Sequence, residues 1–172
     1  MQHDVITIVD EHDTPIGEKA RAGTTHNDIY RVAALWLTDA QTGDVLITQR
    51  KFTKKHDPGK WASAVSGTVE SHETYAENIA KETAEEIGLT GLAFTPGPKQ
   101  FCDDGLHRYF CQWFTATVDK NAVTIVTEED AIETYKWVSR DWLFDDVTQN
   151  PQNYVPSMTG SLTPSARIAD PS

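Results

Sequence analysis

Three glutamates, Glu82, Glu85 and Glu86, lie within five residues near the middle of the chain. If this stretch is helical, the three side chains project within an arc of about 100° and share one face. Like charges at these spacings oppose helix formation by about 0.2–0.5 kcal/mol per pair. Two interpretations are open: a solvated acidic face, or an oxygen-only ligand set of the kind that Mg²⁺ or Mn²⁺ requires.

The residues around the glutamates predict a helix over residues 74–87. Thr74 followed by Glu77 fits a capping box, and Gly88 suits the left-handed residue that ends a helix. A second face of this helix carries residues at apolar helical spacing, namely Ala76, Ile79, Ala80, Thr83 and Ile87. A glycine, Gly67, precedes the helix through a short acidic loop, and the turn there is able to offer backbone carbonyls to a cation.

The 23 residues from 67 to 89, GTVESHETYAENIAKETAEEIGL, resemble the signature of the Nudix family, G-x5-E-x7-R-E-U-x-E-E-x-G-U with U apolar. Six of the seven literal positions match. The seventh carries Lys81 in place of arginine, and Thr83 stands where the family has an aliphatic residue. Lysine keeps the positive charge but lacks the planar fork with which the family arginine orients a neighbouring glutamate.

This resemblance implies a metal-dependent hydrolase that cleaves a diphosphate linked to a second group. Bound Mg²⁺ or Mn²⁺ would neutralise the scissile phosphates and polarise an attacking water. The implied roles are metal ligation by Glu82, Glu85 and Glu86, with support of the site by Gly67, Glu73 and Lys81. A carbonyl near Ser66 and Gly67 is a further ligand in this interpretation.

Hydrolysis also needs a general base. Some Nudix enzymes take the base from the helix itself, so Glu82 and Glu85 are catalytic candidates. Others take it from a later loop, for which the segment TEEDAIE offers Glu128, Glu129 and Glu133. Within that loop we predict Glu129 as the catalytic residue, and a solvated acidic loop is the alternative interpretation.

The loop QRKFTKKHDPGKW carries a third of the basic residues of the chain: Arg50, Lys51, Lys54, Lys55 and Lys60. It is either a solvated loop or a phosphate clamp, in which arginine binds two oxygens and lysine acts as a point charge. Over about residues 5–160 the chain is similar to the Nudix branch of type 1 isopentenyl diphosphate isomerase and its hydrolase-like relatives. In that isomerase the residues matching Arg50 and Lys54 contact the diphosphate, and we predict that Arg50, Lys54 and Lys55 bind substrate.

The isomerase chemistry itself is not expected to transfer. It needs a cysteine before the signature glycine and a metal-binding histidine after it, where this chain has Ser66 and Thr68. The other metal ligands of the isomerase align with Tyr30, His107 and Tyr109. We therefore predict hydrolysis of a small nucleoside diphosphate derivative or related organic diphosphate. An isopentenyl-diphosphate isomerase-like enzyme and a catalytically weak nucleotide-binding sensor are the alternatives.

The six histidines show no metal-ligand spacing among themselves. All except His107 are interpreted as surface residues, His56 among them. His107 differs because its strand is expected to border the cleft. The five tryptophans are interpreted mainly as core residues.

Composition narrows the class of protein further. The chain has 26 acidic and 15 basic residues among 172, a formal charge of −11, which disfavours nucleic-acid polymers and anionic membranes as partners. No apolar run reaches the roughly 18 residues that span a bilayer, and the first residues have no signal-peptide pattern. We expect a cytoplasmic monomer or homodimer, with Cys102 and Cys111 reduced. One domain over residues 1–160 and a flexible tail over 161–172 are predicted.

The predicted fold class is α/β (α+β), a Nudix-like mixed sheet sandwiched by helices, with an N-terminal β-hairpin. Alternating apolar residues also predict a hairpin between residues 30–37 and 45–49. Ser139 suits the N-cap of a second helix. The Pro, Ser, Thr and Asn residues after Val147 predict mostly irregular chain.

Overall fold

The N-terminal hairpin forms as predicted. In the computed structural model, which describes residues 4–161, β1 (Val5–Val9) pairs antiparallel with β2 (Pro15–Ala20). The turn between them is closed by Asp10, whose carboxylate accepts hydrogen bonds from the backbone N–H groups of His12 and Thr14 at 2.8 and 3.0 Å. A short 3₁₀ turn, η1 (Arg21–Gly23), then leads to the long central strand.

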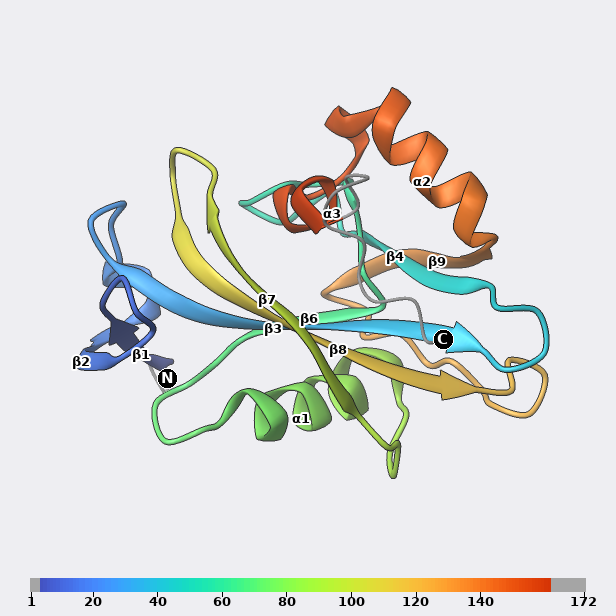
Figure 1. The fold of residues 1–172 in the computed structure, drawn as a ribbon, viewed down its shortest axis with the longest axis horizontal. Coiled ribbons are helices and arrows are strands. Elements are labelled where there is room, and N and C mark those ends of the chain that lie inside the picture. Colours follow the sequence, from blue (N-terminus) through green and yellow to red (C-terminus); the bar gives the residue numbers. More distant parts are fainter. Residues whose placement is uncertain (1–3, 162–172) are drawn as a thin grey trace.

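The central strand β3 (Ile29–Asp39) organises the sheet, because both of its edges are paired (Figure 1). Along one edge it pairs parallel with the whole of β8 (Arg108–Val118), and β7 (Thr95–Asp103) pairs antiparallel with β8. The other edge meets β1 at Ile29 and β6 (Val65–Thr68) at its middle. Apolar side chains on both faces of β3 are buried, which makes this strand the centre of two core layers.

The predicted hairpin after β3 is wrong in one respect, since its two strands separate almost at once. β4 (Val45–Arg50) pairs with β3 only between Thr38 and Val45. It then pairs with β5 (Trp61–Ala62) and β9 (Ile132–Val138), so a second group of strands diverges from the first (Figure 1). The divergence leaves room for a cleft between the two groups.

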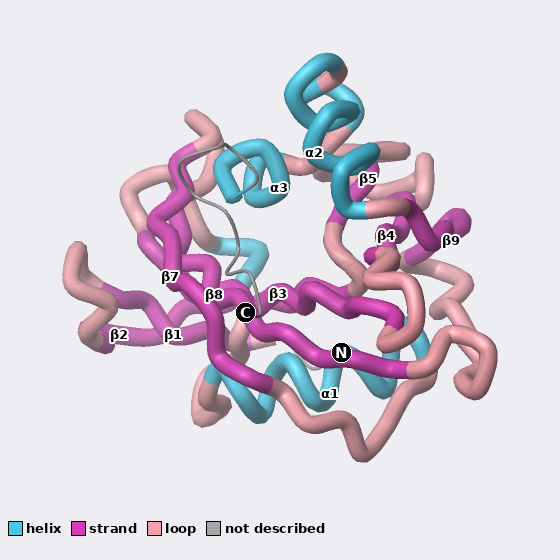
Figure 2. The backbone as a smooth tube through the Cα atoms, turned by 45° about the vertical axis from the view of Figure 1, so that its right-hand side comes forward, coloured by secondary structure: helices cyan, strands magenta, loops and turns pink. Residues whose placement is uncertain are grey.

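The central helix forms where the sequence predicts it, as α1 (Tyr75–Ile87). Thr74 and Glu77 form the complete capping box, and Gly88 ends the helix in the left-handed conformation with φ 72°. The apolar face packs beneath β3 and β6 (Figure 2). Thr83 is fully buried there, and its hydroxyl donates to the carbonyl of Ile79 at 2.6 Å, so a threonine replaces an aliphatic residue without leaving a polar atom unpaired.

The second helix, α2 (Arg140–Gln149), begins as predicted after Ser139, whose hydroxyl accepts a hydrogen bond from the N–H of Trp142. The prediction of irregular chain after Val147 is wrong for much of this region. η2 (Pro151–Asn153) and α3 (Pro156–Ser161) follow. Tyr154 and Met158 are buried in the core layer that contains Ala34 and Trp36 of β3.

Both C-terminal helices cover the face of the sheet opposite α1 (Figure 2). The predicted tail lies outside the described residues, apart from position 161 itself. Within residues 4–161 no helix is long and apolar enough to cross a membrane. Cys102 and Cys111 are both free thiols, as predicted.

Candidate active site

A cleft of about 520 Å³ opens between the two groups of strands. It brings together most of the residues that the sequence singles out, at one end Glu82, Glu85, Glu86 and Gly67 and beside them Arg50 and Lys54. Four predicted site residues do not line it in the described structure: the exposed Lys55 and Glu129, and the supporting residues Glu73 and Lys81. The cleft therefore contains the three glutamates predicted as metal ligands and two of the three predicted cations.

Gly67 is present because Glu82 passes directly over it. A Cβ atom at position 67 would meet the Cγ of Glu82 at 2.4 Å and its Cδ at 2.6 Å. Gly67 lies in β6, paired with Ala33, so a close approach rather than an unusual backbone conformation accounts for the glycine. The strand β6 thus sets the position of the Glu82 carboxylate within the cleft.

The glutamate end of the cleft holds more negative charge than its surroundings neutralise. Burial, together with the charge of Glu85, raises the pKa of Glu82 to about 7. Burial, together with Glu82, raises the pKa of Glu86 to about 8, although the N–H of Ser66 donates to Glu86 at 3.4 Å. Carboxyl groups held in this way bind a proton or a cation much more readily than carboxyl groups in water.

These shifts predict that the metal-free protein loses stability as the pH rises. A carboxyl whose pKa is raised by folding retains a proton that the unfolded chain has already released above pH 4.5. The stabilisation that comes from keeping this proton in the folded state is complete below pH 4.5. It is lost as the pH rises towards the folded-state pKa values of about 7 and 8. We expect the melting temperature in EDTA to fall between pH 5 and pH 8. A melting temperature that rises over this interval would contradict the raised pKa values.

Lys81 and Glu73 contact each other and the loop before α1. The Lys81 ammonium contacts Glu73 at 2.5 Å and Glu70 at 3.4 Å, and lies 4.0 Å from Glu82. The other Glu73 oxygen accepts from the N–H of Glu70 and from Asn78, each at 3.0 Å. Burial alone would raise the pKa of Glu73, but the hydrogen bonds from Lys81 and Asn78 lower it. Glu73 is therefore ionised and anchors both the loop and the lysine.

Lys81→Arg is expected to raise the rate of diphosphate cleavage by about threefold, because a guanidinium can bind Glu73 and Glu82 at the same time. The ammonium of Lys81 reaches Glu82 only at 4.0 Å and leaves that carboxylate less well oriented. Steady-state kinetics with saturating Mg²⁺ measures the change in kcat. Lys81→Met, which keeps the stem and removes the charge, is expected to lower kcat, and equal rates for all three proteins would exclude an orienting role.

The basic loop is held in place at the cleft by its backbone. Arg50 donates from its backbone N–H to the carbonyl of Lys60 at 2.9 Å and from its Nε to the carbonyl of His56 at 3.1 Å. Lys51 and Lys60 are paired with Glu133 and Asp57. Arg50 and Lys54 line the cleft, and neither forms an ion pair with a carboxylate in the described part of the chain. These two cations are available to an anionic ligand.

The acidic loop after β8 contributes a different glutamate from the one predicted. Glu128 lines the cleft, its N–H donates to the carbonyl of Glu86 at 2.9 Å, and its charge helps to raise the pKa values of Glu82 and Glu86. Glu129, the next residue, lies outside the lining, although both glutamates are exposed. The pattern TEEDAIE could not separate the two, because adjacent loop residues point in different directions only once the loop is packed.

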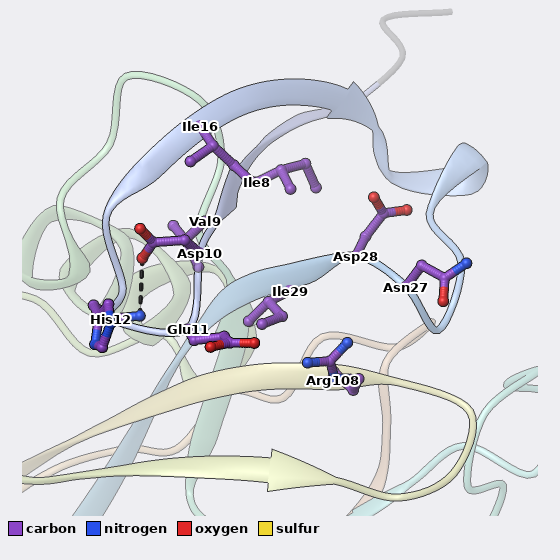
Figure 3. Close-up of a pocket in the computed structure, with 10 residues that line it drawn as sticks. All are labelled: Ile8, Val9, Asp10, Glu11, His12, Ile16, Asn27, Asp28, Ile29 and Arg108. Atoms are coloured by element: carbon purple, nitrogen blue, oxygen red, sulfur yellow. Dashed lines mark hydrogen bonds between the residues drawn. The ribbon is translucent and has the colours of Figure 1, made fainter.

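The far end of the cleft is lined by Tyr30, Tyr109 and His107, whose strand was expected to border the cleft, together with Arg21 and His56. His56 is exposed, as expected, but it also lines the cleft, and no sequence pattern singled out Arg21. A second depression of about 380 Å³ lies between the N-terminal hairpin and β8, lined by Ile8 and Ile16 on the hairpin and by Asp28 and Arg108 (Figure 3). It contains none of the predicted site residues, so the cleft is the candidate active site.

The donor set of the cleft suits a divalent cation. Glu82, Glu85, Glu86 and Glu128 offer carboxylate oxygens only, and the buried Glu86 is the group that most requires a countercharge. Among residues 4–161, no three His, Cys, Asp or Glu side chains are already gathered as a ready metal-binding group. The glutamates therefore fit Mg²⁺ or Mn²⁺ by their chemistry, and bound metal would draw their side chains together.

The fold matches that of a known family. A family model described as the NUDIX domain matches residues 29–158, which is more than half of the chain. The solved structure of DR0079 from Deinococcus radiodurans superposes with a TM-score of 0.77 over 92% of this chain and 96% of that one, at 19% identity. The chain belongs to the Nudix family. It is an enzyme of the pyrophosphohydrolase class.

Two curated relatives show where the chain stands within the family. It is 29% identical to the Nudix hydrolase PA4841 of Pseudomonas aeruginosa over 116 residues, 67% of this chain and 69% of that protein. It is 25% identical to an isopentenyl-diphosphate Delta-isomerase of Klebsiella pneumoniae over 161 residues, 89% of this chain and 85% of that protein. The predicted resemblance to Nudix hydrolases and to the branch of the isopentenyl-diphosphate isomerases is thereby confirmed.

Proposed function

We propose that the protein hydrolyses a diphosphate linkage in a small organic diphosphate, such as a nucleoside diphosphate derivative, with Mg²⁺ or Mn²⁺ as cofactor. The observation that supports this most directly is the composition of the cleft. Four carboxylates at one end, two of them with raised pKa values, lie beside the unpaired cations Arg50 and Lys54. A diphosphate with a bound metal ion would bring a cation to the carboxylates and anionic oxygens to Arg50 and Lys54.

Each side chain then has a defined task. Glu82, Glu85 and Glu86 hold the cation, which would neutralise the phosphates and polarise a water molecule. Arg50 and Lys54 bind the non-bridging oxygens and orient the diphosphate. Lys81 and Glu73 position the loop that carries Gly67. Glu128 is the candidate general base, because it lines the cleft next to the metal-binding glutamates.

The neighbouring glutamates Glu128 and Glu129 provide a matched pair for testing the base. Glu128→Gln is expected to lower kcat by about a hundredfold, the usual contribution of a positioned base. Glu129→Gln makes the same chemical change one residue further along, outside the cleft, and is expected to lower kcat by less than about twofold. The original prediction of Glu129 would be restored if the two effects were reversed.

Isomerisation of isopentenyl diphosphate is not supported as a second function. Where the isomerase carries metal ligands, Tyr30 stacks on Tyr109 with ring centroids 5.6 Å apart, and His107 meets Tyr30 edge-on at 6.3 Å. Ser66 replaces the thiol that the isomerase needs. Among the described residues that line the cleft, none supplies a thiol in its place.

The proposal is tested by product analysis. The pure protein is incubated with Mg²⁺ and a panel of nucleoside diphosphates, triphosphates, nucleotide sugars, dinucleotides and isoprenyl diphosphates, with Glu85→Gln in parallel. Cleavage of one class by the wild type, and not by the variant, supports a catalytic metal site. Mg²⁺-dependent nucleotide binding without any product over hours would instead support the sensor alternative, and formation of an isomer would support the isomerase.

A further inference from the structure

The cleft is larger than a diphosphate requires, and its far end is lined by aromatic, histidine and arginine side chains instead of glutamates. Beyond the glutamates and the basic loop, the cleft runs along β3 to Tyr30, with Arg21 and His107 beside it. Tyr30 lies three residues before Ala33, the strand partner of Gly67. At the rise of an extended strand this places the far end about 10 Å from Gly67.

Four rings form a continuous wall at this end. Tyr30 stacks on Tyr109, His107 lies edge-on to Tyr30, and His56 lies edge-on to His107 with centroids 4.7 Å apart. The Nε2 of His107 is 3.5 Å from the Nδ1 of His56, so the wall joins the β7–β8 loop to the basic loop. The ring faces are largely occupied by one another, and the wall therefore offers its polar edges rather than an open stacking surface.

The polar groups of this wall include hydrogen-bond donors that no described residue engages. Burial raises the pKa of Tyr30 to about 12, so its hydroxyl keeps its proton, and the hydroxyl has no hydrogen-bond partner within residues 4–161. Because His56 and His107 share one hydrogen bond, one of their two remaining ring nitrogens is a donor and the other an acceptor when both rings are neutral, and no described residue engages either. Donors without partners favour a ligand that supplies acceptor oxygens.

Arg21 is the cationic group at this end of the cleft. Seven of the chain's lysines and arginines form ion pairs with carboxylates, but the cleft-lining Arg21 has no such partner in the described residues. Two carboxylates also line this end, Asp4 and Asp104. Asp104 accepts hydrogen bonds from the N–H groups of Leu106 and His107 at 2.8 and 2.6 Å, which holds the β7–β8 loop in shape.

We propose that Arg21, Tyr30, His56 and His107 form a distal subsite that binds a phosphate monoester on the substrate, about 10 Å from the scissile diphosphate. This inference rests on the proposed function, because it names the kind of group that the diphosphate carries. A hydrocarbon chain would leave the same donors and Arg21 unpaired, at an energetic cost. The distal subsite therefore selects phosphorylated nucleotides over isoprenyl diphosphates.

Two pairs of probes isolate the distal subsite. NADPH and NADH, and coenzyme A and dephospho-coenzyme A, all contain a diphosphate and differ within each pair by one phosphate monoester. Dissociation constants are measured by isothermal titration calorimetry with Ca²⁺ present, and cleavage of each probe is measured separately with Mg²⁺. We expect the wild type to bind the member with the extra phosphate about tenfold more tightly in at least one pair, as for one charge-assisted contact.

Variants assign that preference to named side chains. Arg21→Gln and Tyr30→Phe are expected to reduce it to within about twofold and to leave binding of the member without the phosphate unchanged. Arg21 is exposed, and phenylalanine keeps the ring of Tyr30, so both variants are expected to fold. Arg108→Gln is the matched control, because Arg108 follows His107 but packs over Phe101 outside the cleft.

The outcomes separate this inference from the proposed function. Equal affinities within both pairs, or a preference that survives Arg21→Gln, would overturn the distal subsite even if every probe were cleaved. A preference that Arg21→Gln removes would support the distal subsite even if no probe were cleaved, and in that case hydrolysis would be the proposal that fails.

Discussion

Glu86→Gln is expected to abolish diphosphate cleavage and, at the same time, to stabilise the metal-free protein. Glutamine has nearly the same volume as glutamate and can still accept the hydrogen bond from Ser66, but it carries no charge. Loss of a metal ligand is expected to lower kcat by about a thousandfold or more, because the cation contributes several kcal/mol to the transition state. The same change removes a buried charge that folding must otherwise accommodate.

The gain in stability is expected to depend on pH and on metal. At pH 8 the uncharged side chain should raise the free energy of unfolding in EDTA by about 2 kcal/mol, or the melting temperature by about 5 °C. At pH 5 the wild-type Glu86 is protonated in the folded state, since burial raises its pKa to about 8, and the two proteins should then melt alike. Mg²⁺ is expected to stabilise the wild type and not the variant.

Differential scanning fluorimetry at both pH values, with EDTA and with Mg²⁺, measures these effects beside the activity assay. The opposite signs for activity and stability are the distinctive result, because a residue that only supported the fold would lose both on substitution. A variant that melts below the wild type at pH 8 would show that the charge of Glu86 does not destabilise the metal-free protein. A variant that retains cleavage would show that Glu86 is not a required metal ligand.

Gly67→Ala is expected to lower kcat by about a hundredfold with little change in backbone structure, because a displacement of about 1 Å in a catalytic group has effects of this size. The new methyl group would overlap the Cγ and Cδ of Glu82, at 2.4 and 2.6 Å, and the side chain would have to move. The strand itself tolerates alanine, since its partner across the pair is Ala33. The substitution therefore displaces one carboxylate without removing it.

Steady-state kinetics over a range of Mg²⁺ concentrations measures this displacement, and the apparent Mg²⁺ affinity should fall together with kcat. Gly17→Ala is the control for the loss of a glycine in a strand, because nothing lies within 4 Å of a Cβ at that position. Normal activity in Gly67→Ala would mean that Glu82 has room to act from another position, and the close approach would then have no catalytic role.

The helix and its acidic face could be predicted because their determinants are local. A capping box, a terminal glycine and side chains at i, i+3 and i+4 act over a few residues, and α1 begins and ends where they place it. The family signature lies within the same 23 residues. The roles of Glu82, Glu85 and Glu86 as metal ligands stay a prediction that the cleft geometry supports.

Other features depended on contacts between distant segments. The hairpin at residues 30–49 has an ordinary local pattern, yet β3 and β4 separate because β6 occupies the edge that β4 would otherwise share. The composition of the C-terminal residues predicts irregular chain. Tyr154 and Met158 are nevertheless buried, because they pack on apolar side chains of the sheet face opposite α1. Neither outcome follows from propensity or periodicity, since both are decided by packing.

By itself the sequence determined the class of protein, the helix that carries the predicted acidic ligands and the glycine that precedes it. These features depend on the identity and spacing of residues within one short segment. Only the tertiary structure decided which neighbours share the cleft: Glu128 rather than Glu129, Lys54 rather than Lys55, and Arg21 and His56 at the far end. Two adjacent loop residues of the same type cannot be distinguished by sequence pattern. Their side chains acquire different environments only when strands from distant parts of the chain come together around them.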